Sequence, residues 1–238
     1  MPKLSNRVRE EYRPFCSAVV LTAADAGLGA AGLDRSVGGM PILARSLRAL
    51  ERSAAIHEIV IVTQGEKIPG TAKLCRDYGI LKATKILVGG ETWMESALAG
   101  LSEISPKAAL AAIHDAACAL IAEDLIGQTV HAASLSHAAA PAVREREAVK
   151  DTSGDGPAVT VKEAVRVQSP EVFIPELIKA ALARAVQAGE TAADCADACE
   201  RMGFAVRYVE GDEGNIRIRT PQDIAAAEYL IDDRGYGW

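Results

Sequence analysis

The chain has 238 residues, of which 49% are apolar, and a formal net charge of −6 at pH 7. This composition is too apolar for a disordered chain, and no apolar run approaches the ~20 residues that a membrane span requires. The acidic balance argues against a general nucleic-acid binder. A chain of this length is long enough to bury one large core.

The first 15 residues are polar and charged, and we expect them to form a tail ahead of the domain. They lack the apolar centre of a signal peptide, so we expect a cytoplasmic protein. The five cysteines form no CxxC pair and show no metal-ligand spacing, which predicts reduced structural thiols.

Apolar runs and helical periodicity alternate through the first half of the chain. A glycine-rich loop separates the first predicted strand from the first predicted helix. The strands are expected over residues 18–21, 57–63, 84–88 and 109–114, and the helices over residues 41–52, 71–78, 93–103 and 122–135.

The pattern changes between residues 138 and 168, where short alternating segments flank a turn at residues 152–157. We interpret this stretch as an inserted β-arm. Helices are then expected over residues 173–188, 192–202 and 221–231, with a strand over 204–209 and a short extended segment over 215–218.

Strands that alternate with helices predict an α/β fold: a single Rossmann-like domain over residues 16–235, with a mostly parallel sheet covered by helices on both faces and the inserted arm. Ligands of such sheets bind outside the carboxyl ends of the strands. The glycine-rich loop, Gly89-Gly90 and Asp115 converge there. Glycines let backbone N–H groups approach a phosphate closely, although an ordinary strand-to-helix loop has the same composition.

A series of short motifs occurs in a fixed order and resembles the 2-C-methyl-D-erythritol 4-phosphate cytidylyltransferase family. No single motif is specific, but their joint order from residue 18 onward is. The matching segments are Ala23-Ala24 with the glycine loop, 39–43 (GMPIL), 89–96 (GGETWMES), 99–101 (AGL), 113–117 (IHDAA), 168–173 (QSPEVF), Ala193-Asp194, 209–211 (VEG) and 215–224 (NIRIRTPQDI).

The resemblance implies an enzyme that transfers CMP from CTP to the phosphate of a phosphorylated polyol, with Mg²⁺ and with release of pyrophosphate. It also implies a homodimer in which the arm completes the partner's site, and it implies neither a nucleic-acid nor a membrane partner. The implied nucleotide-binding residues are Ala23, Ala24, Gly27, Gly29, Gly89, Gly90, Ser96 and Asp115. The implied substrate-binding residues are Asp194, Lys150, Lys162 and Arg217, the catalytic cations are Arg217 and Arg35, and the metal ligands are Asp115 and Asp212.

Two of these residues have a structural alternative. Asp115 suits Mg²⁺ as a hard oxygen ligand, but it is also a candidate N-cap for the segment that follows. Asp194 is equally a substrate contact or the cap of a helix. His114 is predicted to be structural, and Trp93 is predicted to contribute packing.

The departures from the family pattern fall on its cations. Trp93 and Cys118 stand where the family motifs have arginine, and Arg217 stands where the motif has lysine. The loop motif's arginine and lysine are also missing, and Arg35, Lys150, Lys162 and Arg217 are the available substitutes.

These losses leave a second hypothesis open, a non-catalytic or altered-specificity relative that keeps the fold. A third hypothesis, a nicotinamide-dependent dehydrogenase, comes from the GxGxxG pattern of residues 27–32, and it ranks last because the later motifs point elsewhere.

Overall fold

The computed structural model describes residues 14–22, 32–151 and 159–234. The candidate nucleotide-binding residues Ala23, Ala24, Gly27 and Gly29 lie outside the described residues, as do most of the expected tail and the expected turn of the arm.

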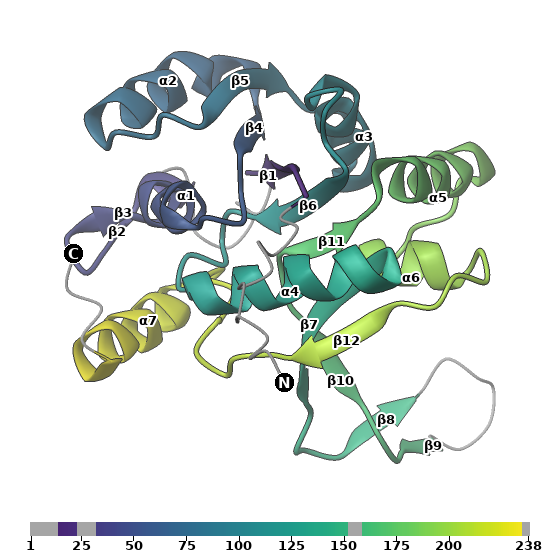
Figure 1. Cartoon of the computed structure of the whole chain (residues 1–238). Coiled ribbons are helices and arrows are strands. Elements are labelled where there is room, and N and C mark those ends of the chain that lie inside the picture. The colour runs from purple at the N-terminus through teal and green to yellow at the C-terminus, as the bar shows by residue number, and fades with distance from the viewer. Residues whose placement is uncertain (1–13, 23–31, 152–158, 235–238) are drawn as a thin grey trace, which may run out of the picture.

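The described elements assemble around one eight-stranded sheet, whose main path runs β10-β7-β11-β6-β1-β4-β5, while β12 pairs with β7 (Figure 1). Its strands are β1 (Cys16–Leu21), β4 (Glu58–Thr63), β5 (Ala83–Val88), β6 (Leu110–Asp115), β7 (Ala138–Arg144), β10 (Val165–Val167), β11 (Glu171–Phe173) and β12 (Arg207–Glu210). Strands β1, β4, β5 and β6 pair in parallel, and β12 is parallel to β7. The two antiparallel members are β10 and β11. The predicted mostly parallel sheet is confirmed.

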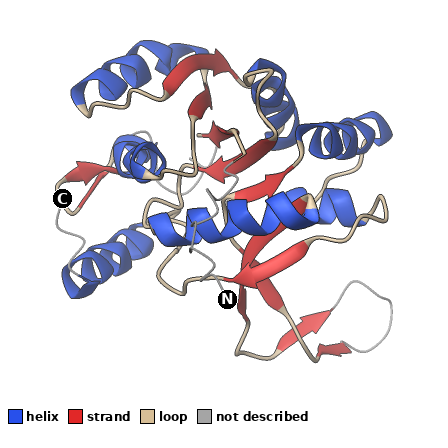
Figure 2. Cartoon of the chain, in the orientation of Figure 1, coloured by secondary structure: helices blue, strands red, loops and turns tan. Residues whose placement is uncertain are grey.

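Helices cover both faces of this sheet (Figure 2). The α-helices are α1 (Ile42–Arg52), α2 (Ile68–Asp77), α3 (Trp93–Glu103), α4 (Glu123–Ser136), α5 (Pro175–Ala188), α6 (Cys195–Glu200) and α7 (Pro221–Arg234), and two 3-10 turns are η2 (Gly32–Asp34) and η3 (Gly65–Lys67). Successive residues of a strand point to opposite faces. Accordingly, Ala18 and Val20 of β1 join the core under α1, α4 and α7, and Val19 joins the core under α3, α5 and α6.

Helix α3 packs unusually close to the sheet at Gly100. A Cβ atom at this position would overlap the side chain of Val19 and lie 2.8 Å from Cγ2 of Val62. The glycine therefore lets α3 lie against β1 and β4, and this fixes the position of Trp93 at the start of the helix.

The bounds of three predicted helices needed correction. Phe173, expected in a helix, belongs to β11, a three-residue antiparallel strand between β6 and β7, and α5 begins at Pro175. The helix expected over residues 192–202 is shorter (α6), and α2 begins earlier, at Ile68. Residues 215–218 are not assigned to a strand.

The expected arm of residues 138–168 divides into two parts. Its first and last segments, β7 and β10, belong to the central sheet, and Ala138, Ala139 and Ala140 of β7 are buried. Within the arm, only β8 (Val149–Asp151) and β9 (Val159–Val161) form a separate two-stranded sheet. A second two-stranded sheet, outside the arm, consists of β2 (Ser36–Val37) and β3 (Met40–Pro41). The projecting part of the arm is therefore shorter than expected.

Within the described part of the chain, none of the helices combines the length and the apolar character needed to cross a bilayer.

Candidate active site

A cavity of about 220 Å³ opens at the carboxyl ends of β1 and β6. Charged and aromatic side chains dominate its wall, namely Trp93, Asp115, Glu171, Asp194, Arg217 and Arg219. A larger hollow of about 470 Å³ lies between Pro14 and α4, but it contains none of the motif residues. The smaller cavity is the better candidate because it collects side chains from five separate motifs.

Asp115 is the last residue of β6, and its carboxylate has two fixed partners. Oδ2 lies 2.8 Å from Nε of Arg217, and Oδ1 accepts the N–H of Ala117 at 2.9 Å. The carboxylate thus caps the turn after β6 while it faces the cavity. It is not the N-cap of the next helix, because that position belongs to Ala122.

Arg217 reaches Asp115 from the segment between β12 and α7. The N–H of the neighbouring Ile218 donates to the carbonyl oxygen of Ala117 at 2.9 Å, which ties this segment to the turn after β6. Burial alone lowers the pKa of Arg217, but the charge of Asp115 and contact with the Cys118 thiol outweigh it, so the pKa is raised. The guanidinium is therefore a permanent cation held in a defined place.

His114 lies directly beneath Asp115 and is fully buried. Its Nε2 lies 3.0 Å from the Ser46 hydroxyl, and its Nδ1 lies 3.0 Å from the Ser169 hydroxyl, which also accepts the N–H of Asp115 at 3.2 Å. Burial and the charge of Arg217 lower its pKa to about 3. The imidazole stays neutral and supports the backbone under Asp115, as expected of a structural histidine.

Glu171 forms part of the cavity floor and was not singled out from the sequence. Its carboxylate accepts the N–H of Cys195 at 3.1 Å and the N–H of Ala196 at 2.7 Å. Burial, together with the charge of Asp194, raises its pKa to about 8 despite these two bonds. The signal that was available is the family motif, which has glutamine where this chain has Glu171.

Asp194 takes one of the two roles that the sequence left open, the cap of a helix. Its Oδ1 accepts the N–H of Asp197 at 2.8 Å, so it caps α6, and the residue also lines the cavity. The bonds from α6 to Glu171 hold this cap over the cavity floor.

The turn between β5 and α3 brings Gly89, Gly90 and Ser96 together. The Ser96 hydroxyl accepts the N–H of Gly90 at 3.1 Å, and a Cβ atom on Gly90 would overlap Glu95. Thr92 and Glu95 form a capping box that starts α3. Trp93 follows at once. Its side chain packs against the core, as predicted, and also lines the cavity.

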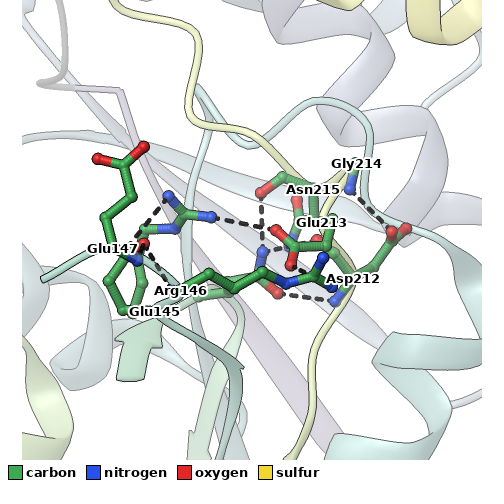
Figure 3. A network of polar contacts seen from close by, with 9 residues as sticks. Glu145, Arg146, Glu147, Asp212, Glu213, Gly214 and Asn215 are labelled. Atoms are coloured by element: carbon green, nitrogen blue, oxygen red, sulfur yellow. Dashed lines mark hydrogen bonds and ion pairs between the residues drawn. The ribbon is translucent and has the colours of Figure 1, made fainter. Parts of the chain in front are cut away.

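Seven of the predicted site residues that the structure describes do not line this cavity, namely Arg35, Gly89, Gly90, Ser96, Lys150, Lys162 and Asp212. Arg35 lies between η2 and β2, Lys150 bonds the Thr160 hydroxyl at 2.6 Å within the arm, and Lys162 is exposed there. Asp212 accepts the N–H of Gly214 at 2.8 Å, inside a polar network at the base of the arm (Figure 3).

That network joins the arm to the segment that carries Arg217. Glu213 lies 3.6 Å from Arg146 and 3.5 Å from Arg166, and the Gln168 side chain donates to the carbonyl oxygens of Asp212 and Asn215 (Figure 3). No group of three or more histidine, cysteine or acidic side chains able to hold a metal occurs in the described ranges.

Comparison with known proteins places these features in a family. The family model of 2-C-methyl-D-erythritol 4-phosphate cytidylyltransferase matches residues 18–233. A protein with this name from Caldanaerobacter subterraneus is 33% identical over 204 residues, covering 82% of this chain and 88% of the relative. Another from Halalkalibacterium halodurans is 34% identical over 200 residues, covering 83% and 87%.

Solved structures agree with this match. The 2-C-methyl-D-erythritol 4-phosphate cytidylyltransferase of Thermus thermophilus is similar with a TM-score of 0.72 and 27% identity, covering 90% of this chain and 98% of that one. The 4-diphosphocytidyl-2C-methyl-D-erythritol synthase of Anaerococcus prevotii has a TM-score of 0.80 at 24% identity, covering 92% and 96%. The matched region includes the GxGxxG pattern of residues 27–32, so the dehydrogenase hypothesis has no support. This chain belongs to the 2-C-methyl-D-erythritol 4-phosphate cytidylyltransferase family.

Proposed function

We propose that this protein transfers CMP from CTP to 2-C-methyl-D-erythritol 4-phosphate and releases pyrophosphate. The observation that carries the proposal is the cavity at the carboxyl end of β6, where Asp115 and Arg217 form a fixed pair beside Arg219 and Asp194. Membership of the family supports the same reaction.

In this reaction a phosphate oxygen of the alcohol phosphate attacks the α-phosphorus of CTP. The new P–O bond forms as the bond from the α-phosphorus to the bridging oxygen breaks, and pyrophosphate leaves with that electron pair. The nucleophile is already an anion, so no base has to remove a proton from it. A neutral, buried His114 is consistent with this chemistry, which depends on alignment and on neutralising charge.

We further propose that a divalent metal, Mg²⁺, binds between Asp115 and the triphosphate. Each Asp115 oxygen has one protein partner and keeps a lone pair for a metal, and Mg²⁺ is commonly held by one or two carboxylates together with substrate phosphates. Asp212 does not fit as a second ligand, because it does not line the cavity. The metal would offset negative charge on the phosphates of CTP.

The proposed reaction is tested by pyrophosphate release from CTP, with and without the alcohol phosphate and Mg²⁺. We expect release only when all three are present, and a slower reaction when UTP or ATP replaces CTP. Binding of CTP without any turnover would instead support the non-catalytic hypothesis.

We also propose a homodimer formed through β8 and β9. In the described residues this small sheet pairs with no strand of the central sheet, and an isolated hairpin is marginal in water. Lys150 lies in β8 and Lys162 directly follows β9, and neither lines the cavity of its own chain, which fits a role at the partner's site.

The homodimer predicts a mass near twice the 25.0 kDa of one chain in light scattering at micromolar concentration. A shortened chain that joins residues 148 and 162 through a glycine linker is expected to elute as a monomer. A full-length protein with the mass of one chain would contradict the proposal.

We propose that residues 16–235 form one domain, supported by the single central sheet. We propose a cytoplasmic protein, supported by five buried cysteines that are all free thiols.

A further inference from the structure

The segment that leads into α7 directs two arginines into the same cavity. Ile218 is completely buried and points into the core under α1, α4 and α7. In extended backbone the neighbours of an inward residue point the other way. Arg217 and Arg219 flank Ile218, and both line the cavity.

The two guanidinium groups differ in what they already contact. Arg217 is engaged by Asp115 and by the Cys118 thiol. Among the residues that the structure describes, no carboxylate lies within ion-pair distance of the Arg219 guanidinium. The main chain of Arg219 is nevertheless fixed, because its N–H donates to Oδ2 of Asp223 at 2.9 Å in the cap of α7.

The size of the cavity limits the ligand that Arg219 can meet. About 220 Å³ is below the ~300 Å³ at which pockets for drug-sized molecules begin, so the cavity suits a short polyol phosphate better than a complete nucleotide. The Ser169 hydroxyl and the Asp194 carboxylate supply hydrogen-bonding groups for alcohol functions in the same wall.

We propose that Arg219 binds the phosphate of the phosphorylated alcohol, as a second cation beside Arg217. This inference rests on the proposed function and names a residue that none of the motifs assigned. An arginine can grip a phosphate through two parallel hydrogen bonds, which a lysine cannot do. The motif has arginine where this chain has Cys118, and Arg219 would add a cation to the cavity wall in a chain that lacks that arginine.

Trp93 offers a readout of binding that does not depend on turnover. It lines the cavity, and the only other tryptophan of the chain is Trp238. In a Trp238→Phe background, the fluorescence of Trp93 is followed during titration with 2-C-methyl-D-erythritol 4-phosphate. A second titration uses a CTP analogue with a methylene bridge between the α- and β-phosphates, in the presence of Mg²⁺, and calorimetry measures the same affinities.

We expect Arg219→Ala to weaken binding of the alcohol phosphate at least tenfold and to leave binding of the CTP analogue within twofold. Arg219→Lys is expected to recover part of the loss. The matched control is Arg76→Ala, which removes an exposed arginine from α2 beside β5 and is expected to change neither affinity. Thermal melting of each variant checks that the fold is retained.

Unchanged affinity for the alcohol phosphate in Arg219→Ala would overturn the inference, as would an equal loss for both ligands or no binding of the alcohol phosphate by the parent protein. A different outcome would contradict the proposed function. A parent protein that binds the alcohol phosphate through Arg219 and yet releases no pyrophosphate would disprove the reaction and leave the inference standing.

Discussion

Replacement of Arg217 by alanine is expected to lower kcat/KM for cytidylyl transfer by about 10³-fold. Loss of an arginine from a transferring phosphoryl group costs roughly 10³–10⁵ in rate, and loss of one transition-state donor costs ~10²–10³. The change also removes the cation that lies 2.8 Å from Oδ2 of Asp115, so the carboxylate would face incoming phosphates without compensation. Both effects lower kcat/KM.

Steady-state kinetics with both substrates varied measures this effect. Arg217→Lys is expected to lose less, because it keeps the charge and only the forked geometry is removed. Arg207→Ala is the matched control, since Arg207 is exposed on β12, ahead of the same segment, and does not line the cavity. A fall of less than tenfold in Arg217→Ala would show that Arg217 does not stabilise the transition state.

The sequence predicts the core strands well and the short strand β11 poorly, for one physical reason. Strands β1, β4 and β6 each contain a run of four apolar residues, as expected for strands buried on both faces. Strand β11 has only three residues and is followed at once by the apolar face of α5, so the two periods merge in the sequence. Its antiparallel pairing with β6 is a tertiary contact that local pattern cannot reveal.

The residues of the candidate site were also predicted only in part. Asp115 and Arg217 were both singled out from motifs, and the structure joins them. Glu171 and Arg219 were missed because the residue type that the family motif has at each position gives no reason to expect a charge there. Only their place in the cavity wall marks them as candidates. Lys150 and Lys162 match the arm by position in the sequence, but only the fold shows that neither lines the cavity of its own chain.

Ionisation of Glu171 is expected to destabilise the fold as the pH rises. The folded-state pKa of about 8 lies above the ordinary carboxyl value of 4.5, since burial penalises the charged form and Asp194 adds a negative charge. Below pH 4.5 the group is neutral in both states. Between pH 4.5 and 8 the unfolded chain binds fewer protons than the folded one, so the free energy of unfolding falls with pH, and above pH 8 it levels off. The slope approaches about 1.4 kcal/mol per pH unit within that window, for a total of a few kcal/mol.

Urea unfolding of the wild type and of Glu171→Gln at pH 6 and pH 9 separates this contribution from other titrations. Glutamine keeps the size of the side chain and cannot ionise. We expect the stability of the wild type, relative to Glu171→Gln, to fall by a few kcal/mol between the two pH values. Glu176→Gln, at an exposed position in the first turn of α5, is expected to follow the wild type.

The same ionisation changes the charge of the cavity wall. Glu171 lines the cavity and bonds the two N–H groups that follow Asp194, so its negative charge opposes binding of a phosphate there. The KM for the alcohol phosphate is therefore expected to rise above pH 8 in the wild type and to stay level in Glu171→Gln. Parallel stability and KM profiles in the two proteins would mean that the N–H groups of Cys195 and Ala196 keep Glu171 ionised throughout, and that α6 is held by a permanent carboxylate.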